Sequence, residues 1–232
     1  LDNSIFYNTG FLDKSYTEAT GKCIVLITPD KERTMNTYLG ATEFLTDVDI
    51  DEELIAQSEW LYLEGYRFDG QKSKKAFYKA IEIAKKNETK IAITLSDSFC
   101  VDRHRSDFIY LLNVSADMVF CNEDELKSLY QIDDIKKAKE FIDDSISCVA
   151  CTCAEKGAYL FHGSSTSEIS TNKVAVVDTT GAGDSFAAGF LYGLSKNFTF
   201  EKCAAFGNVI AGEVLKVYGP RVEKSLKNLV MS

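Results

Sequence analysis

Four consecutive residues, Gly181 to Asp184, carry the clearest chemistry in this sequence of 232 residues. Gly181 and Gly183 place no side chain between their backbone amides and a ligand. Amides at the start of a helix attract anions, because they lack partners inside the helix and the helix dipole adds positive potential. A carboxylate beside such amides suits phosphoryl transfer, in which a hydroxyl loses its proton while charge develops on the phosphoryl group. Asp184 is thus a candidate acceptor for such a proton, and the amides of Gly181, Ala182 and Gly183 are candidate donors to such a charge.

The residues on either side of this turn predict how it is held. Val174 to Val177 form a largely β-branched run, and small or apolar residues at helical spacing follow from Phe186 to Leu194. This pattern predicts a strand, a tight loop and a helix. For Gly-x-Gly-Asp alone, an ordinary helix start is the better interpretation, with Asp184 only interacting with the helix dipole.

The longer string favours a catalytic interpretation. Residues 178–190, Asp-Thr-Thr-Gly-Ala-Gly-Asp-Ser-Phe-Ala-Ala-Gly-Phe, resemble the second signature of the ribokinase-like (PfkB) family of carbohydrate and nucleoside kinases. This resemblance implies that Asp184 is the catalytic base and that residues 181–183 form the anion hole. It also implies a monovalent-cation site, for example for K⁺, near Asp178 and Thr180. The string is not a Walker loop, because no Lys-Ser/Thr pair follows its glycines.

Asn122 and Glu125 follow directly after an apolar run that ends at Cys121. Taken alone, they predict an Asn-capped helix with acidic residues in its first turn. Beside the main signature, they resemble the Asn-x-x-Glu motif of the same family. The resemblance implies that they organise Mg²⁺ and its waters near the phosphates of ATP, which agrees with the preference of Mg²⁺ for oxygen ligands and retained waters.

Two further groups resemble nucleotide contacts of the family. Residues 152–158 resemble its Thr-x-Gly-x-x-Gly loop, in which Thr152 reaches a phosphate and Gly157 permits a close backbone approach, although Ala154 replaces the usual glycine. An ordinary hairpin turn is the alternative for this segment. Asn208 lies in a predicted helix of small residues and matches a position near the adenine ring, with close helix packing as the alternative.

The elements that must position these residues alternate between strand and helix. We predict strands at 60–66, 90–95, 117–121, 148–152 and 158–161, and helices at 47–57, 73–86, 106–113, 123–130, 134–143 and 201–217. Continuous apolar strands between helices indicate an α/β fold with a mostly parallel sheet covered on both faces. The resemblance implies a ribokinase-like fold. Two further strands, at 21–28 and 32–40, are predicted to be remnants of a small β lid within about residues 1–40.

Composition limits the classes of partner. The net charge is −9, from 26 basic and 35 acidic residues, and the lysines of 73–86 fall on the solvated face of an amphipathic helix. We therefore expect a small-molecule sugar or nucleoside substrate, and neither nucleic acid nor membrane as partner. Seven cysteines lie mostly in apolar runs, which favours reduced, buried thiols in the cytoplasm. Cys148, Cys151 and Cys153 with His162 could form a metal site by residue type, but a buried strand is the favoured interpretation, because its alternate side chains point apart.

The chain is predicted to be one partial kinase domain, residues 1–232. It begins at Leu1, and the resemblance implies that the first third, with a glycine-rich first signature and much of the sugar-binding surface, is absent. The expected reaction is ATP-dependent phosphorylation of a primary hydroxyl, and the wider pattern resembles bacterial adenosine kinase-like members. A nucleotide-binding or regulatory protein without kinase activity is the alternative, and a purely structural module is disfavoured. The lid strands are also a candidate homodimer contact.

Ser96 and Asp97, with Arg103 and Arg105 shortly after, also fall near a predicted strand end. They can face a substrate or ATP. The alternative is that Asp97 caps a turn while the arginines are solvated, and these residues are not among the predicted catalytic residues.

Overall fold

The computed structural model describes residues 17–29, 33–223, 225–226 and 229. Its main sheet has six strands that neighbour one another in chain order: β3 (Trp60–Glu64), β4 (Lys90–Thr94), β5 (Met118–Asn122), β6 (Cys148–Thr152), β7 (Ala158–His162) and β8 (Ser165–Ile169). Strands β3 to β6 are parallel, and β7 and β8 extend the sheet in antiparallel fashion. The predicted mostly parallel sheet is confirmed.

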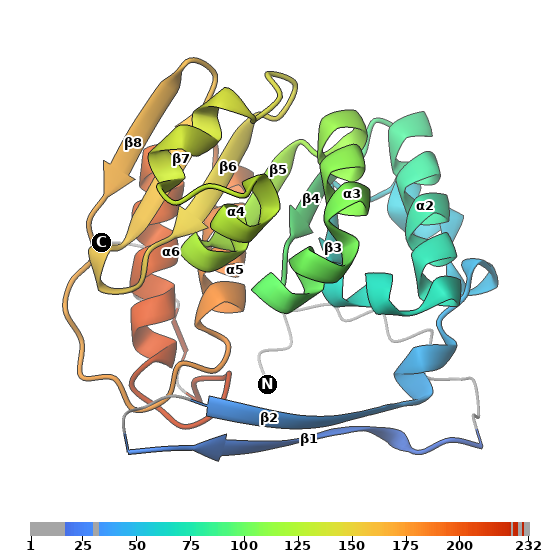
Figure 1. Ribbon diagram of the computed structural model, residues 1–232, viewed down its shortest axis with the longest axis horizontal. Coiled ribbons are helices and arrows are strands. Elements are labelled where there is room, and N and C mark those ends of the chain that lie inside the picture. The colour runs from blue at the N-terminus through green and yellow to red at the C-terminus, as the bar shows by residue number, and fades with distance from the viewer. Residues whose placement is uncertain (1–16, 30–32, 224, 227–228, 230–232) are drawn as a thin grey trace.

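Helices cover both faces of this sheet (Figure 1). On one face, α2 (Gln71–Lys86), α3 (Ser98–Ser115) and α4 (Glu123–Tyr130) share a buried cluster with Ile91, Ile93 and Val149. On the other face, α5 (Ala182–Ser195) and α6 (Phe200–Val214) pack on Phe120 and Ala150. Because successive residues of a strand point to opposite faces, apolar runs without alternation are what two covered faces require. The ribokinase-like α/β arrangement is thereby formed.

The two helices on the second face pack closely because glycines meet at their contact. A Cβ atom added at Gly189 of α5 would lie 2.9 Å from the Cα atom of Gly207 on α6. A Cβ atom at Gly207 would in turn lie 2.8 Å from the carbonyl oxygen of Phe186. Phe120 of β5 contacts the ring of Phe190, with centroids 5.5 Å apart, so α5 is held against the centre of the sheet.

A separate antiparallel sheet consists of β1 (Thr20–Ile27) and β2 (Arg33–Gly40). Figure 1 shows this ribbon lying apart from the main sheet. Several of its apolar side chains are exposed, among them Ile24 at 65% and Leu26 at 55%. Both predicted lid strands therefore exist, and residues 30–32 between them lie outside the described residues.

Some predicted elements differ from the structure. The predicted strand at Val174–Val177 is wrong: these residues form no strand, and the amide of Val177 donates to the carbonyl of Leu215 at 2.8 Å instead. Strand β8 was not predicted, because its sequence, Ser-Thr-Ser-Glu-Ile, has few apolar residues. Helix α3 begins eight residues earlier than predicted, at Ser98, and residues 135–140 form a 3-10 helix, η5 (Ile135–Glu140). The predicted helix at 47–57 is divided into η3 (Asp47–Asp49) and α1 (Glu52–Ala56).

Candidate active site

The candidate site lies where the parallel strands end. Asn122 and Thr152 are the last residues of β5 and β6 and are directly paired in register. Parallel strands end at the same edge of a sheet, and ligands of open α/β sheets bind beyond that edge. The two motifs that are separated in the sequence are thus brought side by side.

The start of α5 differs from the starts of α3 and α4. Asp97 caps α3 by accepting from the amide of Cys100 at 2.6 Å, and Asn122 caps α4 by accepting from the amide of Glu125 at 2.9 Å. By contrast, the N-cap of α5 is Gly181, and no side chain caps that helix. Gly183 in its first turn has open space where a Cβ atom would lie. The amide of Ala182 donates to the carbonyl of Thr179 at 3.3 Å, whereas no side chain occupies the start of α5. This start is therefore open to an external acceptor, as an anion hole requires.

Backbone geometry and a buried carboxylate hold this turn in place. Gly181 has a φ of 78°, a left-handed conformation that favours glycine, and an added Cβ atom would lie 2.5 Å from the Cβ atom of Pro220. Asp178 is buried; its carboxylate accepts from the amide and hydroxyl of Thr180 at 2.8 and 2.7 Å. It also accepts from the amide of Gly219 at 2.8 Å. Asp178 and Thr180 therefore tie the turn to the segment after α6.

Asp184 is exposed in the first turn of α5, next to the accessible amides. Its negative charge acts on two residues of β3, Glu64 and Tyr62. Burial is the main cause that raises the pKa of Glu64, and the negative charge of Asp184 raises it further. The same two causes act on the phenol of Tyr62, whose pKa is also raised. The charge of Asp184 thus acts on an acidic and an aromatic side chain of β3, neither of which the sequence had indicated.

Asn122 and Glu125 form a complete capping box. The Glu125 carboxylate accepts from the backbone amide of Asn122 at 3.0 Å and from its side-chain amide at 2.6 Å. Glu125 is buried, and this burial raises its pKa to about 7, with smaller contributions from the charges of Asp97 and Glu64. The capping interpretation of the motif is therefore confirmed. The magnesium interpretation stays a prediction, although Asn122 also lies at the end of β5 beside the site.

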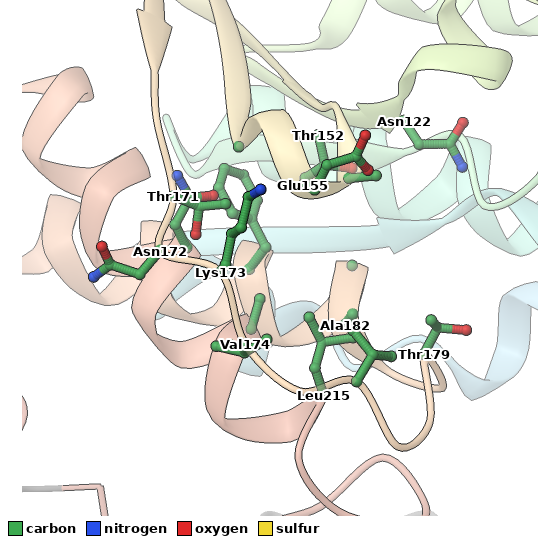
Figure 2. A pocket seen from close by; sticks show the side chains of 18 residues that line it. Asn122, Thr152, Glu155, Thr171, Asn172, Lys173, Val174, Thr179, Ala182 and Leu215 are labelled. Carbon is green, nitrogen blue, oxygen red and sulfur yellow. The ribbon is translucent and has the colours of Figure 1, made fainter. Parts of the chain in front are cut away.

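One pocket of about 710 Å³ joins most of the predicted groups (Figure 2). Its walls come from the ends of β5 and β6, the loop before α5, and the helices α5 and α6. The predicted residues that line it are Asn122, Thr152, Gly157, Ala182, Gly183 and Asn208. The other predicted residues are not among its lining residues: Gly181, Asp184, Glu125, Asp178 and Thr180. Gly181 and Asp184 directly flank the lining residues Ala182 and Gly183 in the chain. The pocket therefore extends from the accessible start of α5 toward α6.

The segment after β6 keeps the backbone shape expected of a glycine-bearing loop. Ala154 adopts a φ of 47°, so alanine occupies the left-handed conformation that the replaced glycine would take easily. Gly157 has a φ of 97°, and an added Cβ atom would lie 2.1 Å from the carbonyl oxygen of Ile169. The requirement for glycine at 157 thus comes from contact with the end of β8. Thr152 donates to the carbonyl of Cys121 at 3.3 Å.

Asn208 lines the pocket from α6 and is buried. Its side-chain NH₂ group donates to the carbonyls of Ile169 and Ser170, both at 3.3 Å. These contacts explain a polar side chain in an apolar helix, because a buried amide must be hydrogen-bonded. They also hold the end of β8 against α6, which forms one wall of the pocket.

Sequence reasoning missed the wall between β8 and α5. Thr171, Asn172, Lys173, Val174 and Val176 line the pocket from an extended loop rather than from a strand. The polar Thr-Asn-Lys run was the available signal, because it breaks the apolar pattern of a central strand. Figure 2 shows that Lys173 and Asn172 leave this loop in different directions.

Asp97, Arg103 and Arg105, which follow β4, have contacts within the protein. Arg103 forms a bidentate ion pair with Asp69, through Nε at 3.0 Å and Nη2 at 2.8 Å. The Nε atom of Arg105 donates to the carbonyl of Ser128 at 3.0 Å. Asp97 caps α3, as its alternative interpretation stated.

The cysteine side chains follow the alternation of a buried strand. Cys148 belongs to the apolar cluster beneath α5 and α6, and Cys151 and Cys153 belong to the cluster on the opposite face. The prediction that they point apart is confirmed for Cys148, whereas Cys151 and Cys153 lie on the same face. All seven cysteines are free thiols.

In the part of the chain that the structure describes, no group of three or more His, Cys, Asp or Glu side chains is arranged to hold a metal ion. The same residues contain no helix with the length and apolar character of a membrane span.

Comparison with known proteins identifies the family. Residues 8–226 match the model of the pfkB family carbohydrate kinases, so the chain belongs to that family. It is 28% identical to an adenosine kinase from Saccharomyces cerevisiae over 218 residues, which cover 87% of this chain and 62% of the relative. A sugar kinase from Archaeoglobus fulgidus, described as uncharacterized, is 36% identical over 100 residues, or 43% of this chain and 40% of the relative.

Solved structures agree with this assignment. The adenosine kinase from Sinorhizobium meliloti superposes with a TM-score of 0.88 and 39% identity, over 91% of this chain and 65% of that chain. A probable sugar kinase from Rhizobium etli gives a TM-score of 0.87 and 38% identity, over 91% and 64%. The chain therefore spans less than two thirds of the length of each of these relatives.

Proposed function

We propose that this protein transfers the γ-phosphoryl group of ATP to a primary hydroxyl of a sugar or nucleoside. The observation that carries this proposal is the uncapped start of α5, which opens on the pocket at Gly183 and carries Asp184 in the same turn. Family membership supports a phosphotransferase acting on a carbohydrate or nucleoside. An adenosine kinase and a cytidine kinase among the relatives favour a nucleoside acceptor, and adenosine is the first candidate.

The proposed roles follow from the positions of the residues. Asp184 accepts the proton of the attacking hydroxyl, and its exposure leaves it accessible to that group. The amides of Gly181, Ala182 and Gly183 receive the charge that develops on the phosphoryl group. Thr152 and Gly157 border the phosphates, and Asn208 borders the base through the wall that it stabilises.

The residues at the end of β5 fit a magnesium site. Glu125 and Asn122 offer oxygen atoms, and the two hydrogen bonds to the Glu125 carboxylate use about half of its acceptor positions. Mg²⁺ prefers such ligands and keeps several waters, so contact through water is suitable. When bound, Mg²⁺ would neutralise charge on the phosphates. We extend the proposal to a monovalent cation such as K⁺ near Asp178 and Thr180.

Three parts of the proposal concern the whole protein. We expect it to act in the cytoplasm, because all seven cysteines are free thiols. Strands β1 and β2 are proposed to act as a lid over the acceptor side, and their exposed apolar residues also suit a homodimer contact. The alternative is a protein that binds nucleotide without transferring phosphate, although a pure binder has no need of Asp184.

A turnover assay with an inactive variant tests the proposal. Purified protein is incubated with Mg-ATP and adenosine, cytidine, ribose or fructose, and the phosphorylated product is detected by mass spectrometry. We expect product with at least one acceptor. Asp184→Asn should lower turnover by about 10²- to 10⁴-fold, because only the proton acceptor is lost, while ATP affinity changes by less than about twofold. Nucleotide binding without any product would favour the binding-only alternative, and full activity of the variant would refute the role of Asp184.

A further inference from the structure

We infer that Lys173 is a nucleotide-binding residue that holds the polyphosphate of ATP from the loop opposite β6. This inference rests on the proposed function, since it concerns the nucleotide that the pocket would bind. Among the described residues that line the pocket, the charged ones are Lys173 and Glu155. Lys173 is therefore the one cation of the described pocket wall.

The Lys173 side chain is available for a ligand. It is exposed, and no hydrogen bond or ion pair holds its ammonium group within the described part of the chain. Its backbone is in a fixed loop, because Val177 and Asp178 further along that loop are anchored to Leu215 and Gly219. A lysine with an anchored backbone and a flexible ammonium group is suited to bind an anion that enters the pocket.

The charge balance of the site favours such a group, in addition to the Mg²⁺ proposed above. The protein carries a net charge of −9, and the start of a helix supplies only about half of a positive charge. The amides of α5 reach one end of the polyphosphate, where transfer takes place. Lys156 lies on the same 3-10 helix as Glu155 (η6, Ala154–Lys156), but its side chain is 72% exposed and its ammonium lies 3.9 Å from the Glu123 carboxylate. Lys173 is thus the cation positioned to neutralise the part of the polyphosphate that is not transferred.

A binding experiment with a series of ligands tests this role. The affinities of the purified chain for adenosine, AMP, Mg-ADP and Mg-ATP are measured by calorimetry. Lys173→Met should weaken Mg-ADP and Mg-ATP by about tenfold, the size of one charge-assisted hydrogen bond, and leave adenosine within about twofold. Lys173→Arg, which keeps the charge, should stay within about threefold of the wild type. Lys75→Met, which removes an exposed lysine of α2, is the matched control and should change nothing.

A double variant separates direct contact from simple neutralisation of Glu155. If Lys173 contacts phosphate, Lys173→Met combined with Glu155→Gln should still bind Mg-ATP weakly compared with Glu155→Gln alone. Full recovery of affinity in the double variant would overturn the inference, because the lysine would then only cancel a neighbouring carboxylate. Equal losses for adenosine and Mg-ATP would also overturn it, as would unchanged affinity of a folded Lys173→Met protein. A wild-type chain that binds none of the four ligands would instead overturn the proposed function, and this inference with it.

Discussion

Glu125 combines two roles that make opposite demands on its charge. As a partner of Mg²⁺ in the proposed site, it must be ionised. As a buried residue of the α4 capping box, it is destabilised in the ionised form, and its pKa is raised to about 7. Near neutral pH the side chain is therefore divided between both forms. A bound cation would favour the carboxylate, so ligand binding and proton release are expected to be coupled at this residue.

This raised pKa predicts a pH dependence of stability. The folded protein binds the Glu125 proton more tightly than the unfolded chain, whose pKa is near 4.5. The stabilising contribution is therefore complete below about pH 4.5 and lost as the pH rises through about 7, with a size of at most about 3 kcal/mol. Glu125→Gln should remove this part of the slope in urea unfolding between pH 5 and pH 8. Glu59→Gln, at an exposed carboxylate, is the control; equal slopes for Glu125→Gln and the wild type would contradict the prediction.

At the scale of elements, the motifs at strand ends could be predicted because their signals are local. Asn122 follows an apolar strand and precedes a Glu three residues later, which suffices for a capping box. The loop at 171–176 could not be predicted in the same way. Its valines are typical of a strand, and only the long-range bond from Val177 to Leu215 explains why no ladder forms. Gly157 was predicted to permit a close backbone approach to a nucleotide. The contact that requires glycine there is with the carbonyl oxygen of Ile169, and it depends on β8, which was not predicted.

The packing of α5 on α6 predicts opposite effects at two glycines. Gly189→Ala places a methyl group 2.9 Å from the Cα atom of Gly207, so the helices must separate, and we expect a loss of about 1–3 kcal/mol in unfolding free energy. Gly183→Ala meets no atom within 4 Å and replaces glycine in a helix, so stability should be equal or higher by up to about 1 kcal/mol. Its methyl group enters the space beside the accessible amides, so turnover should fall. Chemical denaturation and the kinase assay measure both effects, and a stable Gly189→Ala protein would contradict the packing argument.

At the scale of the whole molecule, the two sheets differ in how they are supported. The main sheet is covered on both faces, whereas β1 and β2 form a two-stranded ribbon with exposed apolar side chains. Two-stranded sheets are marginally stable alone. We expect the amides of β1 and β2 to exchange with deuterium orders of magnitude faster than those of β4 to β6. Equal protection in a hydrogen-exchange experiment would show that the ribbon is covered in solution, for example by a second copy of the chain.

The uncapped start of α5 has a consequence for how long the protein survives in its folded form. No side chain caps this start, so its backbone donors are left for a ligand. The ligand-free protein therefore lacks the stabilisation that a capping side chain would supply. A ligand that binds only the folded form restores it, by about 2.7 kcal/mol when present at a hundredfold excess over its dissociation constant. With a nucleotide as that ligand, resistance to unfolding and to proteolysis rises and falls with the supply of nucleotide. The same few amides that would serve the reaction would thus make the lifetime of the protein responsive to the energy state of its surroundings.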